Sequence, residues 1–477
     1  MTPHSSPTAS DTTDAGGHPR RWMILLALTG SLSMIFVDVT VSGVAGPTIA
    51  GEFGSGTDGV AWIANAYLVA LAALMAIGGR LGDILGKRRA FEAGIVGFAA
   101  ASAICGLAGS MEMLLLGRAL QGVGAALMQP ASSALVIECF APGERGKAMG
   151  VYIGIPMTFF ALGPVLGGLV TEHLGWRWVF FVNLPVAAMS LLLAFRAKPP
   201  NRPSPDRAID LPSVAMLVTG LPLLVVSLQE GAHSDGAGSI RLLEPRSLAA
   251  LAGGIALCIL FAWRQLRAAR PLVRLGLFRD RALLANTLLI AIMQFAMAGL
   301  VVEGSVYAQE VLLYDATKAG ASLMPMLVPV IFLAQVAGRR YDRLGVRPLA
   351  RIGTVCATAG FATWGVGCVA TSYPVIALGM ILLGAGVAFI MSPANTDALS
   401  RAPDELRGQV SGLLQTFRQA GGALGVAFAA AIATALEAFG QPLGTAIGGA
   451  MFGGALVAAV GVVVAWRMPS ILPPRRG

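Results

Sequence analysis

Residues 79–89 read Gly79-Arg80-Leu81-Gly82-Asp83-Ile84-Leu85-Gly86-Lys87-Arg88-Arg89, a short glycine-containing turn with one carboxylate and several cations between two apolar stretches. The pattern returns at residues 338–347 as Gly338-Arg339-Arg340-Tyr341-Asp342-Arg343-Leu344-Gly345-Val346-Arg347. Gly, Asp, Gly and Arg match at a common offset of 259 residues, as from Gly79 to Gly338. Such a duplication predicts a chain built from two halves of like orientation.

Around these two Gly-Asp loops the chain is too apolar for a soluble protein. Of its 477 residues, 56% are hydrophobic and only 12% are charged, whereas soluble domains carry about 25% charged residues. A net charge of +9 would indicate nucleic-acid binding if the basic residues shared one face, but they are spaced between apolar runs. We therefore predict a protein embedded in a lipid bilayer, with no nucleic-acid partner.

Apolar stretches recur along nearly the whole chain, each long enough to cross ~30 Å of hydrocarbon as a helix of about 20 residues. We predict fourteen spans, near residues 22–45, 60–79, 90–109, 113–137, 149–170, 179–195, 211–228, 247–265, 283–308, 319–337, 349–368, 374–395, 409–435 and 445–466.

The positions of the 34 basic residues support an even number of spans, because Lys and Arg collect in cytoplasmic loops. With both termini in the cytoplasm, the exceptions are Arg177, Arg241, Arg246 and Lys318 in outer loops and Arg118 and Arg418 in the interior of spans. A single missed or invented span would invert every later loop.

Five stretches carry a resemblance to a known family. They are Asp38-Val39-Thr40-Val41 through Pro47, Gly79 through Arg89, Arg118 with Gln121-Gly122-Val123-Gly124, Gly163-Pro164-Val165-Leu166-Gly167-Gly168, and Trp176-Arg177-Trp178 through Asn183-Leu184-Pro185. On these residues the chain resembles, over essentially its full length, the fourteen-span drug:proton antiporter family of the major facilitator superfamily. Ser42 and Gly46 depart from that family, which usually has Asn and a bulkier apolar residue there, and this bears on the substrate more than on the class.

The resemblance implies an all-α membrane protein with the major facilitator fold, two six-helix bundles plus two extra transmembrane helices. Residues 22–195 would form the N-terminal bundle and residues 282–466 the C-terminal bundle, with the two extra helices in the linker 196–281. We expect residues 1–21 to form a disordered cytoplasmic tail, since they begin with a stretch rich in Ser, Thr, Pro and Gly. Residues 467–477 would form a second cytoplasmic tail.

Asp38 and Arg118 are charged residues within apolar spans, where burial of a bare charge is expensive. Counted from the outer ends of their spans, both lie roughly 7 residues, or about 10 Å, into the membrane, so they can meet. They form either a static pin between two helices or a proton site, since burial raises an acid's proton affinity and a nearby Arg lowers it. Glu303, a second intramembrane acid, could bind a proton or a cationic substrate, or could lie in a wet outer vestibule.

Arg418 occupies the middle of a long predicted helix and has no acid at a matching depth. Three roles are open: reaching the cytoplasmic surface, pairing between the bundles, or attracting an anionic group of a substrate. The polar candidates for lining a central substrate cavity are Asn65, Tyr67, Gln121 and Asn395.

The small residues at 163–168 have two explanations, helix packing and an antiporter motif. Gly163 and Gly167 share one helical face and Pro164 favours a kink, which close helix packing explains without any chemistry. By the family resemblance, Gly163, Pro164, Gly167 and Gly168 are similar to the antiporter motif, whose bend would block leak and favour antiport. Residues 163–167 are echoed at residues 421–425, and the dipeptide at residues 145–146 is echoed at residues 407–408.

The two Gly-Asp loops have two explanations. Glycine permits a tight turn, and an Asp can cap a helix start or pair with an Arg, so a plain cytoplasmic turn with topogenic charge accounts for either loop alone. In a transporter of two bundles, we expect the loops to act as cytoplasmic latches between them. The latch residues would be Gly79, Asp83, Gly86, Arg88, Gly338, Asp342 and Arg347.

Together these features predict a proton-coupled antiporter of a bacterial plasma (inner) membrane that exports small amphipathic molecules, such as drugs, antibiotics or metabolites, by alternating access. A proton-linked importer of a nutrient or siderophore is the main alternative, and a membrane sensor is a further one. An enzyme is disfavoured because no His cluster, metal spacing or activated nucleophile lies within the spans. We expect no cofactor, the proton gradient as energy source, and a functional monomer.

Overall fold

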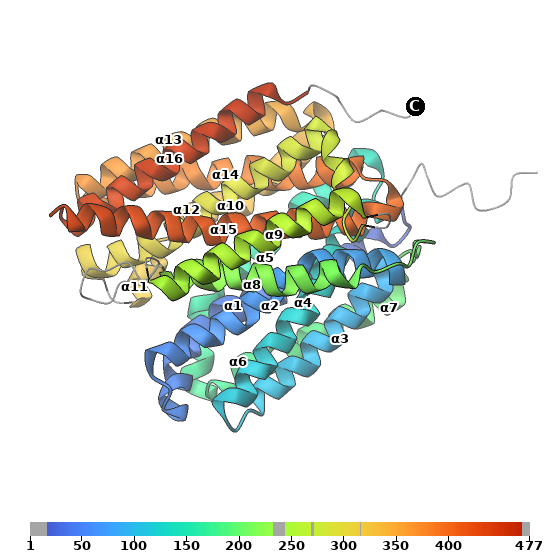
Figure 1. The fold of residues 1–477 in the computed structure, drawn as a ribbon, viewed down its shortest axis with the longest axis horizontal. Coiled ribbons are helices and arrows are strands. Elements are labelled where there is room, and N and C mark those ends of the chain that lie inside the picture. Colours follow the sequence, from blue (N-terminus) through green and yellow to red (C-terminus); the bar gives the residue numbers. More distant parts are fainter. Residues whose placement is uncertain (1–16, 232–243, 269–270, 315, 470–477) are drawn as a thin grey trace, which may run out of the picture.

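The computed structural model describes residues 17–231, 244–268, 271–314 and 316–469, and over these residues every regular element is a helix (Figure 1). The expected all-α architecture is confirmed. The tails predicted at residues 1–21 and 467–477 lie largely outside the described residues. The helices form two groups, coloured from blue to blue-green and from yellow to red in Figure 1, with a green pair lying across them.

The first group runs from Arg21 to Ala197. Its helices are α1 (Arg21–Phe53), α2 (Gly56–Leu85), α3 (Lys87–Gly106), α4 (Met111–Cys139), α5 (Arg145–Leu174), α6 (Arg177–Phe181) and α7 (Asn183–Ala197), with the 3₁₀ turn η2 (Pro142–Glu144) before α5. The sixth predicted span is thus a short helix and a longer one that meet at Val182. Pro185 stands in the first turn of α7, where its missing N–H breaks no helical hydrogen bond.

The second group runs from Arg281 to Arg467. Its helices are α10 (Arg281–Val306), α11 (Ala316–Ala321), α12 (Met324–Leu344), α13 (Val346–Val369), α14 (Tyr373–Arg401), α15 (Arg407–Ala438) and α16 (Leu443–Arg467). Short turns η4 (Leu275–Arg279), η5 (Tyr307–Val311) and η6 (Asp404–Leu406) flank them.

Helices α8 (Leu211–Gly231) and α9 (Pro245–Arg267) form the green pair between the groups in Figure 1. They pack against each other, and α8 also contacts α2 and α15. Only 11% of the most apolar stretch of α9 is buried, and its exposed side chains include Ile259, Leu260 and Leu266. This surface is suited to lipid.

Twelve helices in the described part of the chain are long and apolar enough to cross a membrane, and there are up to thirteen spans if the two segments of bent α5 count as one. The segments Pro142–Gly163 and Val165–Leu174 meet at 50° around Pro164, which fits the loss of a backbone donor at a proline. Helix α8 adds only a shorter apolar stretch, Leu211–Leu224. The predicted count of fourteen is therefore not confirmed.

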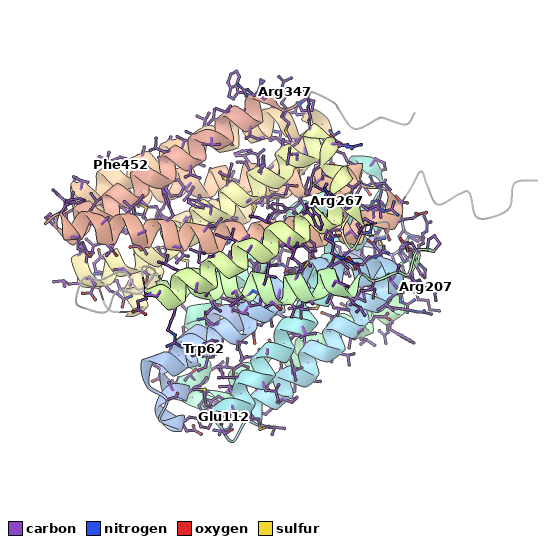
Figure 2. The ribbon with its side chains drawn as sticks, viewed as in Figure 1. Trp62, Glu112, Arg207, Arg267, Arg347 and Phe452 are labelled. Carbon is purple, nitrogen blue, oxygen red and sulfur yellow. The ribbon has the colours of Figure 1, made fainter. Side chains whose placement is uncertain are left out.

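Two helix pairs make most of the contact between the groups: α2 with α15, and α5 with α12. Glycines bring their backbones close, because a Cβ on Gly79 would overlap the carbonyl oxygen of Gly408, and one on Gly338 would overlap that of Gly146. These contacts lie at the end of the molecule that holds both Gly-Asp loops and the first turns of α5 and α15, which we call the basic end. Figure 2 labels Arg207, Arg267 and Arg347 toward this end and Trp62, Glu112 and Phe452 toward the other.

Candidate functional site

A buried polar network surrounds Asp38 inside the N-terminal group. Asp38 and Arg118 are 0% and 1% exposed, and Nη1 of Arg118 donates to Oδ2 of Asp38 at 2.5 Å. The other carboxylate oxygen, Oδ1, accepts from Nε2 of Gln121 at 3.0 Å and from Nδ2 of Asn183 at 2.9 Å. One guanidinium and two amides therefore hold the Asp38 carboxylate.

Arg118 has partners for each of its nitrogens. Its Nε donates to the carbonyl oxygen of Ile63 at 2.9 Å, Nη1 also donates to Oε1 of Gln121 at 2.8 Å, and Nη2 donates to Oγ of Ser42 at 3.3 Å. The guanidinium lies 4.7 Å from the ring centroid of Tyr67. The network thus joins α1, α2, α4 and α7, and Ser102 adds α3. Removal of either charge would leave the other buried without its partner, which would destabilise the protein by about 3–5 kcal/mol.

Sequence analysis did not assign three members of this network: Ser42, Ser102 and Asn183. Oγ of Ser102 accepts from Gln121 at 2.8 Å and from Asn183 at 3.3 Å. Asn183 stood in a motif used for the family resemblance, but its hydrogen bond spans 145 residues of sequence, so no local pattern marked it as a partner of Asp38.

Glu303 lies apart from this network, in α10 of the C-terminal group. It is 7% exposed. No described residue donates a hydrogen bond to its carboxylate or forms an ion pair with it. The structure therefore does not bring Glu303 together with Asp38 and Arg118.

The first Gly-Asp loop reaches across to the other group. Oδ1 of Asp83 accepts from the backbone N–H of Gly408 at 2.9 Å, and Oδ2 accepts from that of Gln409 at 2.8 Å. Both N–H groups belong to the first turn of α15, where they have no partner within the helix and where the helix dipole favours a negative charge. Asp83 is thus a cap supplied by the opposite group.

The second Gly-Asp loop makes the equivalent contact in the reverse direction. Oδ1 of Asp342 accepts from the N–H of Gly146 at 2.8 Å, and Oδ2 accepts from that of Lys147 at 3.0 Å, at the start of α5. The following glycines, Gly86 and Gly345, have φ of +90° and +75°, which L side chains rarely adopt. Two related caps therefore close the basic end.

A buried lysine that sequence analysis did not single out reinforces the first cap. Lys87 is 2% exposed, and its Nζ lies 2.6 Å from Oε1 of Glu138 and 3.7 Å from Oδ1 of Asp83. The same Nζ donates to the carbonyl oxygen of Asp404 in the opposite group at 2.7 Å. Lys87 is therefore a cation that bridges the two groups.

Two cations that sequence analysis placed in the latch do not make this crossing. Arg88 pairs with Glu92 of its own helix at 2.8 Å. Nε of Arg347 is buried without a hydrogen-bond partner among the described residues. Arg88 and Arg347 therefore occupy equivalent positions in the two Gly-Asp loops but make different contacts.

The C-terminal group holds a buried carboxylate of its own, Asp397 in α14, which is 1% exposed. It accepts from Nδ2 of Asn286 at 2.7 Å, from the hydroxyl of Tyr341 at 3.3 Å and from Nε of Arg401 at 2.6 Å. Asp397 follows Glu138 by 259 residues, the offset of the loops, so each half places an acid beside its own loop. Sequence analysis missed it because it lies just beyond the predicted span 374–395.

A small cavity of about 30 Å³ lies between the two groups. Its walls come from α1, α4 and α5 on one side and from α10, α12, α14 and α15 on the other. Four methionines contribute to the lining, Met149, Met157, Met297 and Met391. Among the described residues that line it, Arg418 is the one that carries a charge.

The predicted cavity residues divide between this space and the Asp38 network. Asn395 and Arg418 line the cavity. Gln121 is a partner of Asp38, and Tyr67 packs its ring against Arg118. Asn65 is only partly buried and does not contribute to the lining.

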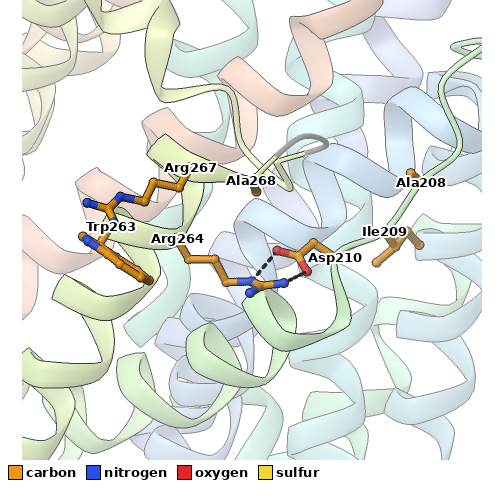
Figure 3. A pocket seen from close by; sticks show the side chains of 7 residues that line it. All are labelled: Ala208, Ile209, Asp210, Trp263, Arg264, Arg267 and Ala268. Carbon is orange, nitrogen blue, oxygen red and sulfur yellow. Dashed lines mark hydrogen bonds and ion pairs between the residues drawn. The ribbon is translucent and has the colours of Figure 1, made fainter.

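A larger and more open pocket of about 470 Å³ lies at the basic end of the α8–α9 pair (Figure 3). Figure 3 shows Arg264 directed at Asp210, with hydrogen bonds of 2.8 and 2.7 Å, while Arg267 and Trp263 point elsewhere. The hydrogen bonds from Arg264 lower the pKa of the Asp210 carboxyl, which precedes α8. This pocket lies outside the interface of the two groups, so the smaller cavity is the candidate site for a molecule that passes between them.

Gly163 and Gly167 face α1. A Cβ on Gly163 would overlap Oγ1 of Thr40, and one on Gly167 would lie 3.0 Å from Cα of Val41, whereas Gly168 has no neighbouring atom within 4 Å. Two of the three glycines are therefore required by packing. In the described ranges, no cluster of three or more His, Cys, Asp or Glu residues is placed to hold a metal ion.

Comparison with known proteins agrees with this architecture. Residues 26–426 match the Major Facilitator Superfamily. The chain is 33% identical to the tetracenomycin C resistance and export protein of Streptomyces glaucescens, over 89% of this chain and 78% of that protein. It is also 33% identical to a puromycin resistance protein of Streptomyces alboniger, over 86% of this chain and 82% of that protein.

Solved structures show the same fold at low sequence identity. The human organic anion transporter MFSD10 superposes with a TM-score of 0.65 at 18% identity, covering 94% of this chain and 99% of that chain. A proton:xylose symporter, XylE, superposes with a TM-score of 0.66 at 15% identity, covering 94% of this chain and 96% of that chain.

Proposed function

Because this chain belongs to the Major Facilitator Superfamily, and is thus a multi-pass membrane transporter of small molecules, we propose that it is a proton-coupled antiporter that exports amphipathic molecules by alternating access. Its similarity to proteins named for tetracenomycin C export and puromycin resistance supports efflux as the direction. The two groups of helices are then the moving bundles.

The observation that carries this proposal is the pair of reciprocal caps at the basic end. Asp83 caps α15 and Asp342 caps α5, so each bundle supplies the anion and the helix start that the other needs. Hydrogen bonds from a helix N-terminus to a carboxylate are worth roughly 1 kcal/mol or somewhat more each, and water can replace them. Contacts of this strength can hold one end closed and still release it during a transport cycle.

The latch consists of both Gly-Asp loops. Gly79 and Gly338 allow the backbones to touch, while Asp83 and Asp342 supply the caps. Gly86 allows the turn after the first cap, and its neighbour Lys87 takes the bridging role expected of a cation there. Arg88 and Arg347 contribute charge that keeps the loops on the cytoplasmic side.

Asp38 is the proposed proton site, paired with Arg118. Protonation of Asp38 would leave the guanidinium of Arg118 with neutral partners only, which changes the attraction between α1 and α4. Helix α1 also packs against Gly163 and Gly167 of α5, and the first turn of α5 is capped by Asp342. The proton site and the second latch are thus joined through α1 and the bent helix α5.

Four further assignments belong to this proposal. The basic end faces the cytoplasm, with both termini on that side, because the loops there carry most of the Lys and Arg residues. Helix α8 completes fourteen spans, and the protein acts as a monomer. Glu303 binds a second proton or a cationic group.

Dye accumulation in cells and in everted membrane vesicles tests the function. Cells that express the protein should hold less of an amphipathic fluorescent dye than control cells, and an uncoupler should abolish the difference. In vesicles, Asp38→Asn should lose uptake driven by a proton gradient, while Ser102→Ala, which removes only a neutral hydroxyl from the network, should retain most of it. Higher accumulation on expression would favour an importer, and normal proton-driven transport by Asp38→Asn would remove Asp38 from the mechanism.

A further inference from the structure

We propose that the transported molecule is an amphipathic acid whose anionic group, a carboxylate or an ionised phenol or enol, pairs with Arg418 in the cavity between the bundles. This inference rests on the proposed export function and names the substrate class of that same site.

Arg418 is an isolated cation. Its Nε has no hydrogen-bond partner, and no hydrogen bond or ion pair joins its side chain to any described residue. It is the one charged side chain among the described residues that line the cavity. A cation without a partner in a medium of low dielectric constant attracts an anion strongly and repels a second cation.

The depth of Arg418 rules out contact with water at the cytoplasmic surface. It lies eleven residues after Arg407, the first residue of α15, which is about 17 Å along the helix at ~1.5 Å per residue. The hydrocarbon core is ~30 Å thick, so Arg418 is near its middle. An arginine side chain is too short to cover the distance from there to either surface.

Among the residues that the structure describes, the buried acids are engaged elsewhere or lie too far away. Asp38 is held by Arg118, Asp397 by Arg401, and Asp83 by the first turn of α15. Glu303 is free, but it lies 22 residues after Arg281, the basic-end start of α10. That depth of about 33 Å differs from the depth of Arg418 by roughly 16 Å.

The rest of the cavity accepts an apolar body. Its lining includes Leu32, Phe36, Val330 and Val387 beside the four methionines, whose flexible side chains adapt to different shapes. At about 30 Å³ the cavity has room for little more than water. Drug-sized ligands need pockets of about 300 Å³ or more, so the bundles must move apart to admit one. The lining also contains the uncharged polar residues Gln129, Ser133, Tyr152, Asn395 and Gln415. An anionic head on a largely apolar skeleton matches one cation in this mainly apolar lining.

Binding in detergent tests the inference without any proton gradient. The probes are an anthracene carboxylate, its neutral amide and the aminomethyl analogue, with dissociation constants measured from fluorescence at neutral pH. The wild type should bind the carboxylate at least about tenfold more tightly than the amide, since a charged hydrogen-bonded pair is worth roughly 10- to 100-fold in affinity. Arg418→Gln should remove that preference, and Arg418→Lys should restore part of it, because Lys keeps the charge but not the bidentate fork.

The matched control is Arg246→Gln, which removes an exposed arginine at the start of α9 and should leave all three affinities unchanged. Equal binding of the three probes by the wild type, or a preference for the amine, would overturn the inference. So would a parallel loss of carboxylate and amide binding in Arg418→Gln, which would mark a structural role. If Arg418→Gln does not fold, the comparison of probes on the wild type still decides.

Transport separates this inference from the proposed function. In everted vesicles with an imposed proton gradient, uptake of the carboxylate should exceed that of the amide. If the carboxylate binds selectively but is not taken up in response to the gradient, Arg418 is still an anion-binding residue and the proposed antiport function is refuted. Gradient-driven uptake with no preference for the carboxylate would leave the antiporter and refute the acidic substrate.

Discussion

The cap that Asp83 supplies to α15 should control how long the basic end stays closed. Each oxygen of this carboxylate accepts one backbone N–H, from Gly408 at 2.9 Å and from Gln409 at 2.8 Å. Asp83→Ala removes both hydrogen bonds, whereas Asp83→Asn keeps one acceptor and loses the charge. The two substitutions should therefore shift the closed state toward the open state to different extents.

The number of hydrogen bonds lost sets the expected destabilisation of the closed state. A hydrogen bond to a charged group contributes about 1.5 kcal/mol net, so Asp83→Ala should destabilise the closed state by about 3 kcal/mol and Asp83→Asn by about half of that. Since each 1.4 kcal/mol is tenfold, the closed-to-open ratio should fall by roughly 100-fold and 10-fold respectively. Removal of the charge also deprives Lys87, whose Nζ lies 3.7 Å from Oδ1 of Asp83, of one anionic neighbour, while burial of the Asp83 carboxylate works in the opposite direction because it disfavours the charged form.

Distances between spin labels can measure this ratio in the purified protein. Labels at Arg89 and Glu405, which are exposed on opposite bundles at the basic end, report its opening directly. The free cysteines of the protein, which the label would also modify, must first be replaced: Cys105, Cys139, Cys258, Cys356 and Cys368. The wild type should give a short distance, Asp83→Asn a mixture, and Asp83→Ala mainly the longer distance.

The control is Glu92→Gln, which removes a carboxylate of the same region whose ion pair among the described residues is with Arg88 of its own helix. It should leave the distance distribution unchanged. Identical distributions in Asp83→Ala and the wild type would refute the latch, as would an equal response to Glu92→Gln.

Three further predictions test other contacts. Gly338→Val should hold the basic end open, because its Cβ overlaps the carbonyl oxygen of Gly146, and the same label pair would show the longer distance. Gly167→Leu should destabilise the protein by about 2 kcal/mol or more through its clash with α1, and it should make vesicles leak protons. The control Gly168→Leu, which meets no atom within 4 Å, should have neither effect. Thermal unfolding measures the loss of stability, and a pH-sensitive dye inside the vesicles measures the proton leak. Hydrogen bonds from Arg264 lower the pKa of Asp210, so their stabilising contribution is present above the unfolded pKa near 4 and is lost as the pH falls through the lower folded value. Protease should therefore cleave the α8–α9 pair faster in Asp210→Asn than in the wild type at neutral pH, and this difference should disappear at a pH below the folded pKa of Asp210.

The sequence alone determined that this is a helical membrane protein of two related halves. A bilayer admits only segments whose backbone groups bond internally, so runs of about 20 apolar residues identify the helices without any tertiary information. The duplicated loop is likewise visible in the amino-acid sequence itself. Charges inside apolar spans must find partners, which is why Asp38 and Arg118 could be paired by depth before the structure was known.

Only the tertiary structure decided which groups meet across the bundles. The hydrogen bond from Gly408 to Asp83 joins residues 325 apart, and no local pattern encodes such a pairing. Helices that are apolar on nearly every side do not reveal which face packs inward, so Asn183 and Lys87 could not be placed from periodicity. The isolation of Arg418 is also a tertiary property, because whether a buried charge has a partner depends on how the neighbouring helices are rotated and how deep their acids lie.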